Sequence, residues 1–140
     1  MYINKMNLKF ASLHENESFA RLAVASFCAN LNLTFEDISD IKTAVSEGVT
    51  NSIVHGYSEN EGMIEINCEI YDNYIKIEII DEGVGIDDIG EAIKPFFTTK
   101  PEMERSGMGF TVMEGFMDKM EVFSEKGKGT KVVLIKNYTV

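Results

Sequence analysis

The chain has 140 residues, 44% hydrophobic and 26% charged, a composition that predicts one globular domain spanning residues 1–140. Its net charge of −10, with no concentrated basic stretch, excludes a protein that binds a nucleic-acid backbone directly. No apolar run approaches the ~20 residues of a membrane span, the N-terminal residues lack a signal-peptide core, and there are only two cysteines, so we expect a cytoplasmic protein without membrane association or a disulfide framework.

The N-terminal part of the chain predicts a strand followed by a helix. Apolar and polar residues alternate from Met6 to Phe10, which is typical of a strand with one buried face. The next segment, ENESFARLAVASFCANL, has apolar side chains at helical intervals and predicts a helix over residues 15–31. Asn16 is the expected cap of this helix.

A second helix is predicted from Thr34 to about His55. The spacing of Thr34 and Asp37 is that of a capping box, in which each residue satisfies a backbone N–H group of the other. Gly56 is expected to end the helix in the left-handed conformation. One stripe of the helix is expected to be buried, comprising Ile38, Ile41, Val45, Val49, Ser52 and Ile53.

The middle of the sequence predicts a β-hairpin. Isoleucine and cysteine alternate with polar residues over residues 64–70, and isoleucine alternates again over residues 75–79. Asp72 and Asn73 supply the turn between the two strands. One face of the hairpin is therefore apolar and ready to be covered by the helices.

Residues 87–109 have weak periodicity and contain both prolines of the chain, which favours a functional loop or lid over a simple connection. A helix from about Phe110 to Asp118 and two strands, MEVFSE and TKVVLI, complete the pattern. The order βααββ–loop–αββ predicts an α+β fold, a two-layer sandwich with helices on one face of a mixed or mainly antiparallel sheet.

Glu47 and Asn51 are one turn apart on the second predicted helix, and the polar stripe continues through His55. A carboxylate and a carboxamide in this arrangement can hold a hydrated Mg²⁺ ion and orient a hydroxyl group, because magnesium takes few protein ligands and keeps water and phosphate as the others. A simple solvated helix face is the alternative interpretation.

The segment DEGVGI follows the hairpin. Asp81, at the end of a strand, can accept a hydrogen bond from an exocyclic amino group such as that of adenine. Gly83 and Gly85 would let a flat base approach the main chain, and Gly85 with Ile86 would open the lid. A plain turn is the alternative, and the glycine spacing is not the Rossmann fingerprint.

The segment RSGMGF precedes a helical run, so the amides around Gly107, Met108 and Gly109 can bind phosphate at a helix N-terminus, with Ser106 as a further donor. A glycine-rich hinge is the alternative. The turn KGKGT places Thr130 at the start of the last strand, which alone would indicate only hairpin chemistry.

The order of these motifs resembles the GHKL (Bergerat) ATPase superfamily of gyrase, Hsp90, histidine kinases and MutL over nearly the whole chain. The stretches ENESFAR, VSEGVTNSIVHGY, DEGVGI, FFTTKPEMERSGMGF and MEGFMD resemble more specifically the bacterial anti-sigma serine kinases, in particular their sporulation members. The lid sequence makes this resemblance specific, since ATP binding alone does not require it.

The resemblance implies a role for each matching residue. Glu47 would be the general base toward a serine hydroxyl, and Asn51 would hold Mg²⁺. Asp81 would contact the adenine amino group, with Gly83 and Gly85 beneath the base. The remaining ATP contacts would come from the lid, the glycine-rich segment and the last strand, namely Ile86, Thr98, Lys100, Ser106, Gly107, Met108, Gly109 and Thr130.

The resemblance also implies partners. Such a protein binds a sporulation sigma factor as a homodimer and phosphorylates an anti-anti-sigma protein on serine, and Arg21 would lie at the docking surface. Two alternatives stay open: the ATPase domain of a histidine kinase, although the sequence around His14 lacks the usual phosphoacceptor context, and a nucleotide-sensing module without transferase activity, in which Glu47 would have no purpose.

Overall fold

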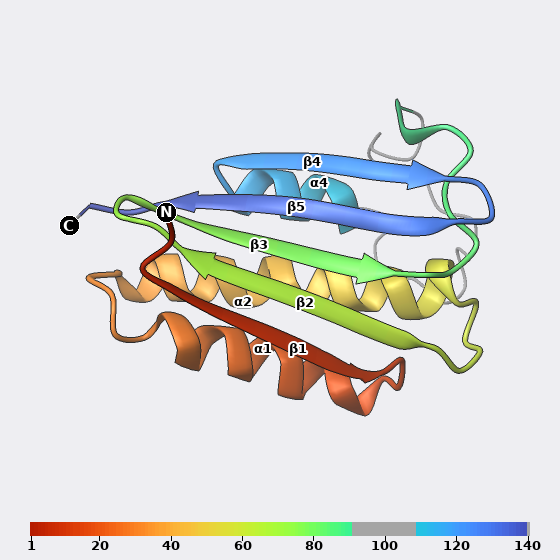
Figure 1. The fold of residues 1–140 in the computed structure, drawn as a ribbon, viewed down its shortest axis with the longest axis horizontal. Helices are drawn as coiled ribbons and strands as arrows, with labels where there is room; N and C mark the ends of the chain where they lie inside the picture. The colour runs from red at the N-terminus through yellow and green to blue at the C-terminus, as the bar shows by residue number, and fades with distance from the viewer. Residues whose placement is uncertain (91–108, 140) are drawn as a thin grey trace.

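The computed structural model describes residues 1–90 and 109–139. Figure 1 shows the arrangement of the helices and strands. Along the chain they are β1 (Asn4–Ala11), α1 (Glu15–Cys28), α2 (Phe35–Asn51), the π-helical turn η1 (Ser52–Gly56), β2 (Met63–Ile70), β3 (Tyr74–Asp81), α4 (Gly109–Phe116), β4 (Lys119–Glu125) and β5 (Gly129–Asn137). The predicted order of strands and helices is confirmed.

The five strands form one sheet in the order β1-β2-β3-β5-β4 (Figure 1). Every pairing between neighbouring strands in the described residues is antiparallel, so the sheet is not mixed. The register places Asp81, the last residue of β3, opposite Thr130 at the start of β5. The predicted turn at Asp72 and Asn73 joins β2 to β3.

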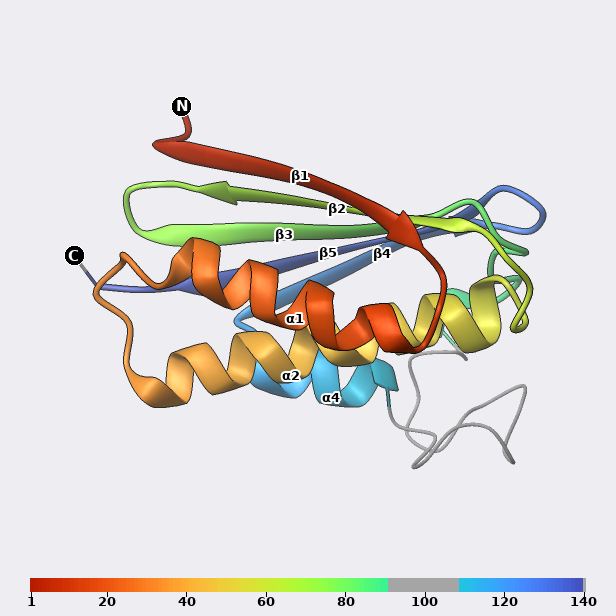
Figure 2. The same cartoon turned by 90° about the horizontal axis from the view of Figure 1, so that it is seen from below.

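The helices α1, α2 and α4 lie on one side of the sheet (Figure 2), which confirms the predicted two-layer α+β sandwich. The strand alternation explains this arrangement, because every second residue of β2 and β3 is apolar and buried under the helices, namely Ile64, Ile66, Cys68, Ile70, Ile75, Ile77 and Ile79. Together they bury the core, whose largest fully buried side chains include Ile41, Ile53, Ile64, Ile66, Ile75, Ile77, Ile79, Met113 and Leu134.

The start of α1 differs from the expectation. His14 occupies the N-cap position without a side-chain capping bond, so Asn16 is not the cap. The Asn16 side chain instead donates to the Ala11 carbonyl over 3.0 Å and fixes the connection from β1 to α1. A cap prediction from sequence was wrong here because a carbonyl of the preceding strand offers a competing acceptor.

The start of α2 is as predicted and its end is not. Thr34 and Asp37 form a capping box, with bonds of 3.0 and 3.2 Å. At the other end the helix widens into η1 rather than stopping at a left-handed Gly56; the positive φ angles fall on Ser58 and Glu59. Gly56 serves packing instead, because a Cβ atom there would come within 2.9 Å of Asp81 Oδ2.

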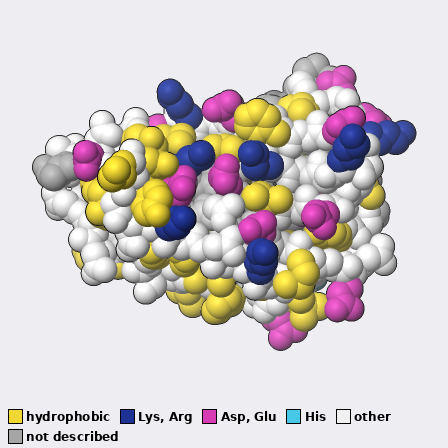
Figure 3. Space-filling model, in the orientation of Figure 1, with side chains coloured by type: hydrophobic (Ala, Val, Ile, Leu, Met, Phe, Trp, Pro, Cys, Tyr) yellow, Lys and Arg dark blue, Asp and Glu magenta, His cyan; other side chains and the backbone are white. Residues whose placement is uncertain are grey.

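The face of the sheet away from the helices carries charged side chains of both signs among apolar ones (Figure 3). Lys131 of β5 is typical of this face: its ammonium group lies 3.7 Å from the Glu78 carboxylate and 5.3 Å from the centre of the Phe123 ring. A groove of about 590 Å³ crosses this face beside Ile80 and Phe123. Its lining also includes Asp81, Ser124 and Thr130, where β3 ends and β5 begins.

Candidate functional site

Asp81, at the end of β3, is a buried acid whose two carboxylate oxygens both accept hydrogen bonds. The residue is 4% exposed; Oδ2 accepts a hydrogen bond from Ser52 Oγ over 2.8 Å, and Oδ1 accepts one from the Gly83 amide over 2.9 Å. Burial raises the pKa of Asp81, and the bonds from Gly83 and Ser52 oppose that rise. A buried carboxylate held at a strand end is suited to read one specific donor of a ligand.

The DEGVGI turn is held between η1 and the β4–β5 turn. The Val84 amide donates to the Gly56 carbonyl over 2.8 Å, and the Val84 carbonyl accepts from Gly127 over 2.6 Å. A Cβ atom on Gly83 would lie 2.0 Å from the Gly56 oxygen, and one on Gly85, whose φ is +76°, would lie 2.1 Å from the Glu125 oxygen. Both glycines are therefore required by close packing of main chain.

This finding changes the reason given above for the two glycines. We expected them to leave room for a flat base, but their missing Cβ atoms would point at the protein's own backbone. The consequence for a ligand is indirect: the glycines let the turn pack against Gly56 and so place Asp81. Whether Gly83 and Gly85 also lie beneath a base stays a prediction.

Thr130 and Ile86 meet at the same end of the sheet through a residue that the sequence did not single out. Thr130 is buried opposite Asp81, and its Oγ1 lies 2.8 Å from Ser124 Oγ. Ser124 Oγ accepts from the Ile86 amide over 2.8 Å and can donate to the Gly129 carbonyl. The start of the predicted lid is thus connected to Thr130 through Ser124.

Glu47 and Asn51 lie in the last turns of α2, and both are half-buried. Because Ser52, the next residue, donates to Asp81, this end of α2 and the end of β3 belong to one cluster. Gly48 lets α2 approach its neighbours closely, since a Cβ atom there would lie 2.4 Å from Ile79 Cδ1 and 3.4 Å from Met113 Sδ.

The helix α4 runs antiparallel to α2 (Figure 2). Met113 lies beside Gly48, and Gly109 precedes Met113 by four residues, or about 6 Å of helix. Ser52 lies about 6 Å beyond Gly48 on α2 by the same rise. The buried first turn of α4 is therefore level with Asn51 and Ser52. The N-terminus of a helix favours an anion.

Five further predicted contacts, Thr98, Lys100, Ser106, Gly107 and Met108, lie outside the described residues. Arg21 is described, and its contacts are within α1: an ion pair with Glu17 at 3.4 Å and a bond to Ser18 Oγ at 3.0 Å. Its neighbours Phe19 and Leu22 are about half exposed, at 51% and 53%. Arg21 is thus on a partly apolar surface of α1, separate from the Asp81 contacts.

Four residues of the cluster were missed as site residues: Ser52, Gly56, Tyr57 and Ser124. Tyr57 accepts from the Glu82 amide over 2.8 Å and donates to the Met63 carbonyl over 2.6 Å, so it supports the turn from outside. Ser52 had a sequence signal, because a hydroxyl in an apolar helical stripe needs a buried partner. The other three have no such signal, since the contacts that bring them to the site are with residues 25 to 38 positions away: Gly56 with Asp81, Tyr57 with Glu82 and Ser124 with Ile86.

Within residues 1–90 and 109–139, no three His, Cys, Asp or Glu side chains form a group that could hold a metal ion. Such a group is not needed for magnesium, which takes one or two protein ligands together with phosphates. Asn51 and Glu47, one turn apart and level with the α4 N-terminus, fit that limited demand. No described helix is long and apolar enough to cross a membrane.

Comparison with known proteins shows the family of this chain. Residues 10–136 match the family described as the Histidine kinase-like ATPase domain, which implies ATP binding. The chain is 57% identical to the "Anti-sigma F factor" of Clostridium beijerinckii, over 98% of this chain and 96% of that protein. It is 58% identical to the "Anti-sigma F factor" of Caldanaerobacter subterraneus, over 96% of this chain and 94% of that one.

Solved structures show the same fold at lower identity. A Mycobacterium tuberculosis protein with RsbU and RsbW domains superposes with a TM-score of 0.68 at 18% identity, over 95% of this chain and 31% of that one. The histidine kinase domain of an Erythrobacter litoralis blue-light-activated kinase gives a TM-score of 0.60 at 16% identity, over 86% and 59%. On its sequence and fold, this chain belongs to the anti-sigma F factors of the histidine kinase-like ATPase family.

Proposed function

We propose that this protein is an anti-sigma factor that holds a sigma factor of the sigma-F type inactive and is also a Mg-ATP-dependent protein-serine kinase. Its substrate would be a serine of an anti-anti-sigma protein, and it would act in the cytoplasm as a homodimer. The observation that carries the proposal is one cluster of groups: the Asp81 carboxylate bonded to Ser52, with Glu47 and Asn51 in the adjoining turns and the α4 N-terminus level with them.

The adenine end of the site is the best supported part. Asp81 has its two oxygens oriented by Ser52 and Gly83, and the charge on the carboxylate suits an amino donor. Thr130, fixed opposite Asp81 and beside Ser124, would support the base. Ile86 would link this pocket to a lid over residues 87–109, in which Thr98, Lys100, Ser106, Gly107 and Met108 remain proposed phosphate contacts.

In the transfer step, the serine Oγ forms a bond to the γ-phosphorus while the bond from that phosphorus to the β–γ bridging oxygen breaks and ADP leaves. Glu47 would accept the hydroxyl proton, and the amides at Gly109 would stabilise phosphate charge. Mg²⁺, held through Asn51, would neutralise phosphate charge. The metal ion is needed for this because the chain has a net charge of −10 and few basic residues.

The kinase half is tested by incubating the protein with ATP, Mg²⁺ and a purified anti-anti-sigma protein, with a serine-to-alanine form of that partner as control. We expect phosphoserine on the unmodified partner and none on the alanine form. Absence of phosphoserine on the unmodified partner would contradict the kinase assignment. The anti-sigma half is tested separately by pull-down of the sigma factor, comparing ATP with ADP. If equal amounts of the sigma factor were recovered when this protein is left out, the anti-sigma assignment would be contradicted.

A histidine-kinase reaction is the competing enzyme assignment, and His14 is where it would be looked for. The ring Nε2 of His14 lies 2.8 Å from the Glu59 carboxylate, whose negative charge opposes an incoming phosphoryl group. Acid-labile phosphate on His14 would nevertheless overturn the serine-kinase proposal. A module that only senses nucleotide would bind ATP and give no phosphoserine.

A further inference from the structure

Lys136 is the one buried basic side chain in the part of the chain that the structure describes. It is 8% exposed and lies on the helix-facing side of β5, in line with the buried Val132 and Leu134. Strand alternation would assign an apolar residue to this position. A buried ammonium group is unfavourable unless it is paired, so its partners show what it does.

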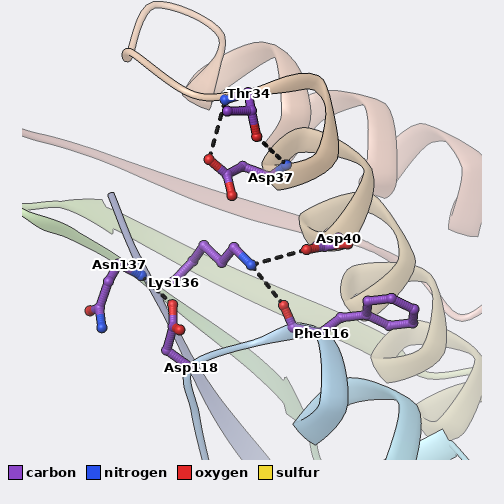
Figure 4. A network of polar contacts seen from close by, with 7 residues as sticks. All are labelled: Thr34, Asp37, Asp40, Phe116, Asp118, Lys136 and Asn137. Carbon is purple, nitrogen blue, oxygen red and sulfur yellow. Dashed lines mark hydrogen bonds and ion pairs between the residues drawn. The ribbon is translucent and has the colours of Figure 1, made fainter. Parts of the chain in front are cut away.

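The Lys136 ammonium group joins three elements (Figure 4). It lies 3.1 Å from Asp40 Oδ2 on α2 and donates to the carbonyl of Phe116, the last residue of α4, over 2.9 Å. A second pair of bonds fixes the segment after α4 to the same strand: the Asp118 amide donates to Ile135 O over 2.8 Å, and Asp118 Oδ2 accepts from the Asn137 amide over 2.7 Å. The C-terminal end of α4 is thus held to both β5 and α2.

Gly48 and Met113 lie side by side between α2 and α4. Gly48 has no side chain and Met113 is unbranched and adaptable, so this pair alone does not fix the position of α4 along α2. A polar contact with one correct geometry can fix that position. The Asp40–Lys136–Phe116 contact, at the end of α4 away from Gly109, is placed to do this.

We propose that Lys136 is a positioning residue: by tying the last turn of α4 to Asp40, it sets where the N-terminus of α4 lies relative to Glu47 and Asn51. The inference rests on the proposed function, in which those three features hold the phosphates, the metal ion and the reacting hydroxyl. Lys136 itself touches none of them. Its effect is carried through the rigid helix α4, which is only eight residues, about 12 Å, long.

The test compares Lys136→Met with Lys131→Met. Both lysines are on β5 and paired with an acid, but Lys131 faces the uncovered side of the sheet and is 41% exposed. In Lys136→Met we expect ATP affinity to fall about tenfold and the transfer rate at saturating ATP to fall by about tenfold or more, since small misplacements of reacting groups are costly. Lys131→Met should match the parent in both, and Lys136→Arg should recover most of the loss.

A purely structural role would lower the unfolding midpoint of Lys136→Met without changing nucleotide affinity or the transfer rate of the folded protein, and that result would overturn the proposal. If Lys136→Met does not fold, Asp40→Asn removes the charge of the partner while keeping its size and replaces it in the same assays. A parent-like Asp40→Asn would also overturn it.

Amide hydrogen exchange separates this inference from the function on which it rests, because it needs no nucleotide. Exchange across α4 should be faster in Lys136→Met than in Lys131→Met, while α1 is unchanged. Unchanged exchange in α4 contradicts the positioning role even if the protein is a kinase. Faster exchange in α4 supports it even if the parent transfers no phosphate to serine.

Discussion

Ser52 donates its hydroxyl hydrogen to Asp81 Oδ2 over 2.8 Å and so joins the end of α2 to the end of β3 across 29 residues of sequence. The contact is buried on both sides, since Ser52 is 4% exposed and Asp81 is also 4% exposed. It explains why a hydroxyl group interrupts the apolar stripe of α2. It also fixes the orientation of the carboxylate that we propose for adenine.

Replacing Ser52 with alanine should destabilise the protein by about 1–3 kcal/mol, because a buried carboxylate loses a donor. Ser46→Ala is the matched control in the same helix, since the buried Ser46 hydroxyl has no hydrogen-bond partner among the described residues. Urea unfolding of the two variants measures the difference. Equal stabilities would mean that the Ser52–Asp81 contact contributes nothing.

The ionisation of Asp81 should contribute to the pH dependence of the unfolding free energy. Burial raises the pKa of Asp81 above its ordinary value of 3.8, so the folded state binds this proton more tightly than the unfolded chain. The ionised carboxyl therefore costs stability above the folded-state pKa, and this cost disappears as the pH falls through that pKa toward 3.8.

Asp81→Asn cannot ionise and lacks this contribution. The difference in unfolding free energy, Asp81→Asn minus parent, should be largest at about pH 7. It should become smaller as the pH is lowered to about 4, because the parent carboxyl then takes up its proton and the parent gains stability. Urea unfolding at several pH values follows the difference. Asp72→Asn, in the exposed β2–β3 turn, controls for loss of one acid, and a profile for Asp81→Asn that parallels this control would contradict the assignment.

Sequence patterns predicted what depends on neighbouring residues and missed what depends on distant ones. The capping box of Thr34 and Asp37 is complete within four residues, so it could be recognised and is confirmed. Gly56 was interpreted as a helix end, yet its role is set by Asp81, 25 residues further along the chain. The burial of Lys136 has no signal in the sequence, because its partners Asp40 and Phe116 are 96 and 20 residues away.

Glu47→Gln should separate nucleotide binding from phosphoryl transfer. Glutamine keeps the size of the side chain and its hydrogen-bonding capacity but cannot accept a proton at neutral pH. We expect ATP affinity to stay within about twofold and the transfer rate to fall by about 100-fold or more, the range for loss of a general base. Glu36→Gln, exposed in the first turn of α2, is the control. Transfer at the parent rate would remove Glu47 from the mechanism.

Asn51→Ala should change the dependence on magnesium. With one protein ligand lost, we expect half-maximal transfer to require about tenfold more Mg²⁺, while ATP affinity without the metal is unchanged. Titration of Mg²⁺ at fixed ATP measures the shift, and chelation should abolish transfer in every variant. Asn30→Ala, in the exposed α1–α2 connection, should behave as the parent. Identical titrations for the two variants would place the metal elsewhere.

Gly83→Ala and Gly115→Ala make the same chemical change in two opposite environments. A Cβ atom on Gly83 would lie 2.0 Å from the oxygen and 2.3 Å from the carbonyl carbon of Gly56, and main chain cannot rotate away as a side chain can. The turn must therefore shift, which strains the bond from Val84 to Gly56 and the bond from the Gly83 amide to Asp81. We expect a loss of about 3 kcal/mol, from overpacking and weakened hydrogen bonds together.

Gly115 is exposed in α4. Apart from its chain neighbours and the helix's own backbone, no heavy atom of the described residues lies within 4 Å of the position its Cβ would take. Alanine there should raise stability by up to about 1 kcal/mol, because it favours the helix. Urea unfolding gives both values, and ATP binding should weaken only in Gly83→Ala, since only that change moves Asp81. A stable Gly83→Ala protein with full ATP affinity would contradict this prediction, because it would show that the turn can shift without disturbing the carboxylate.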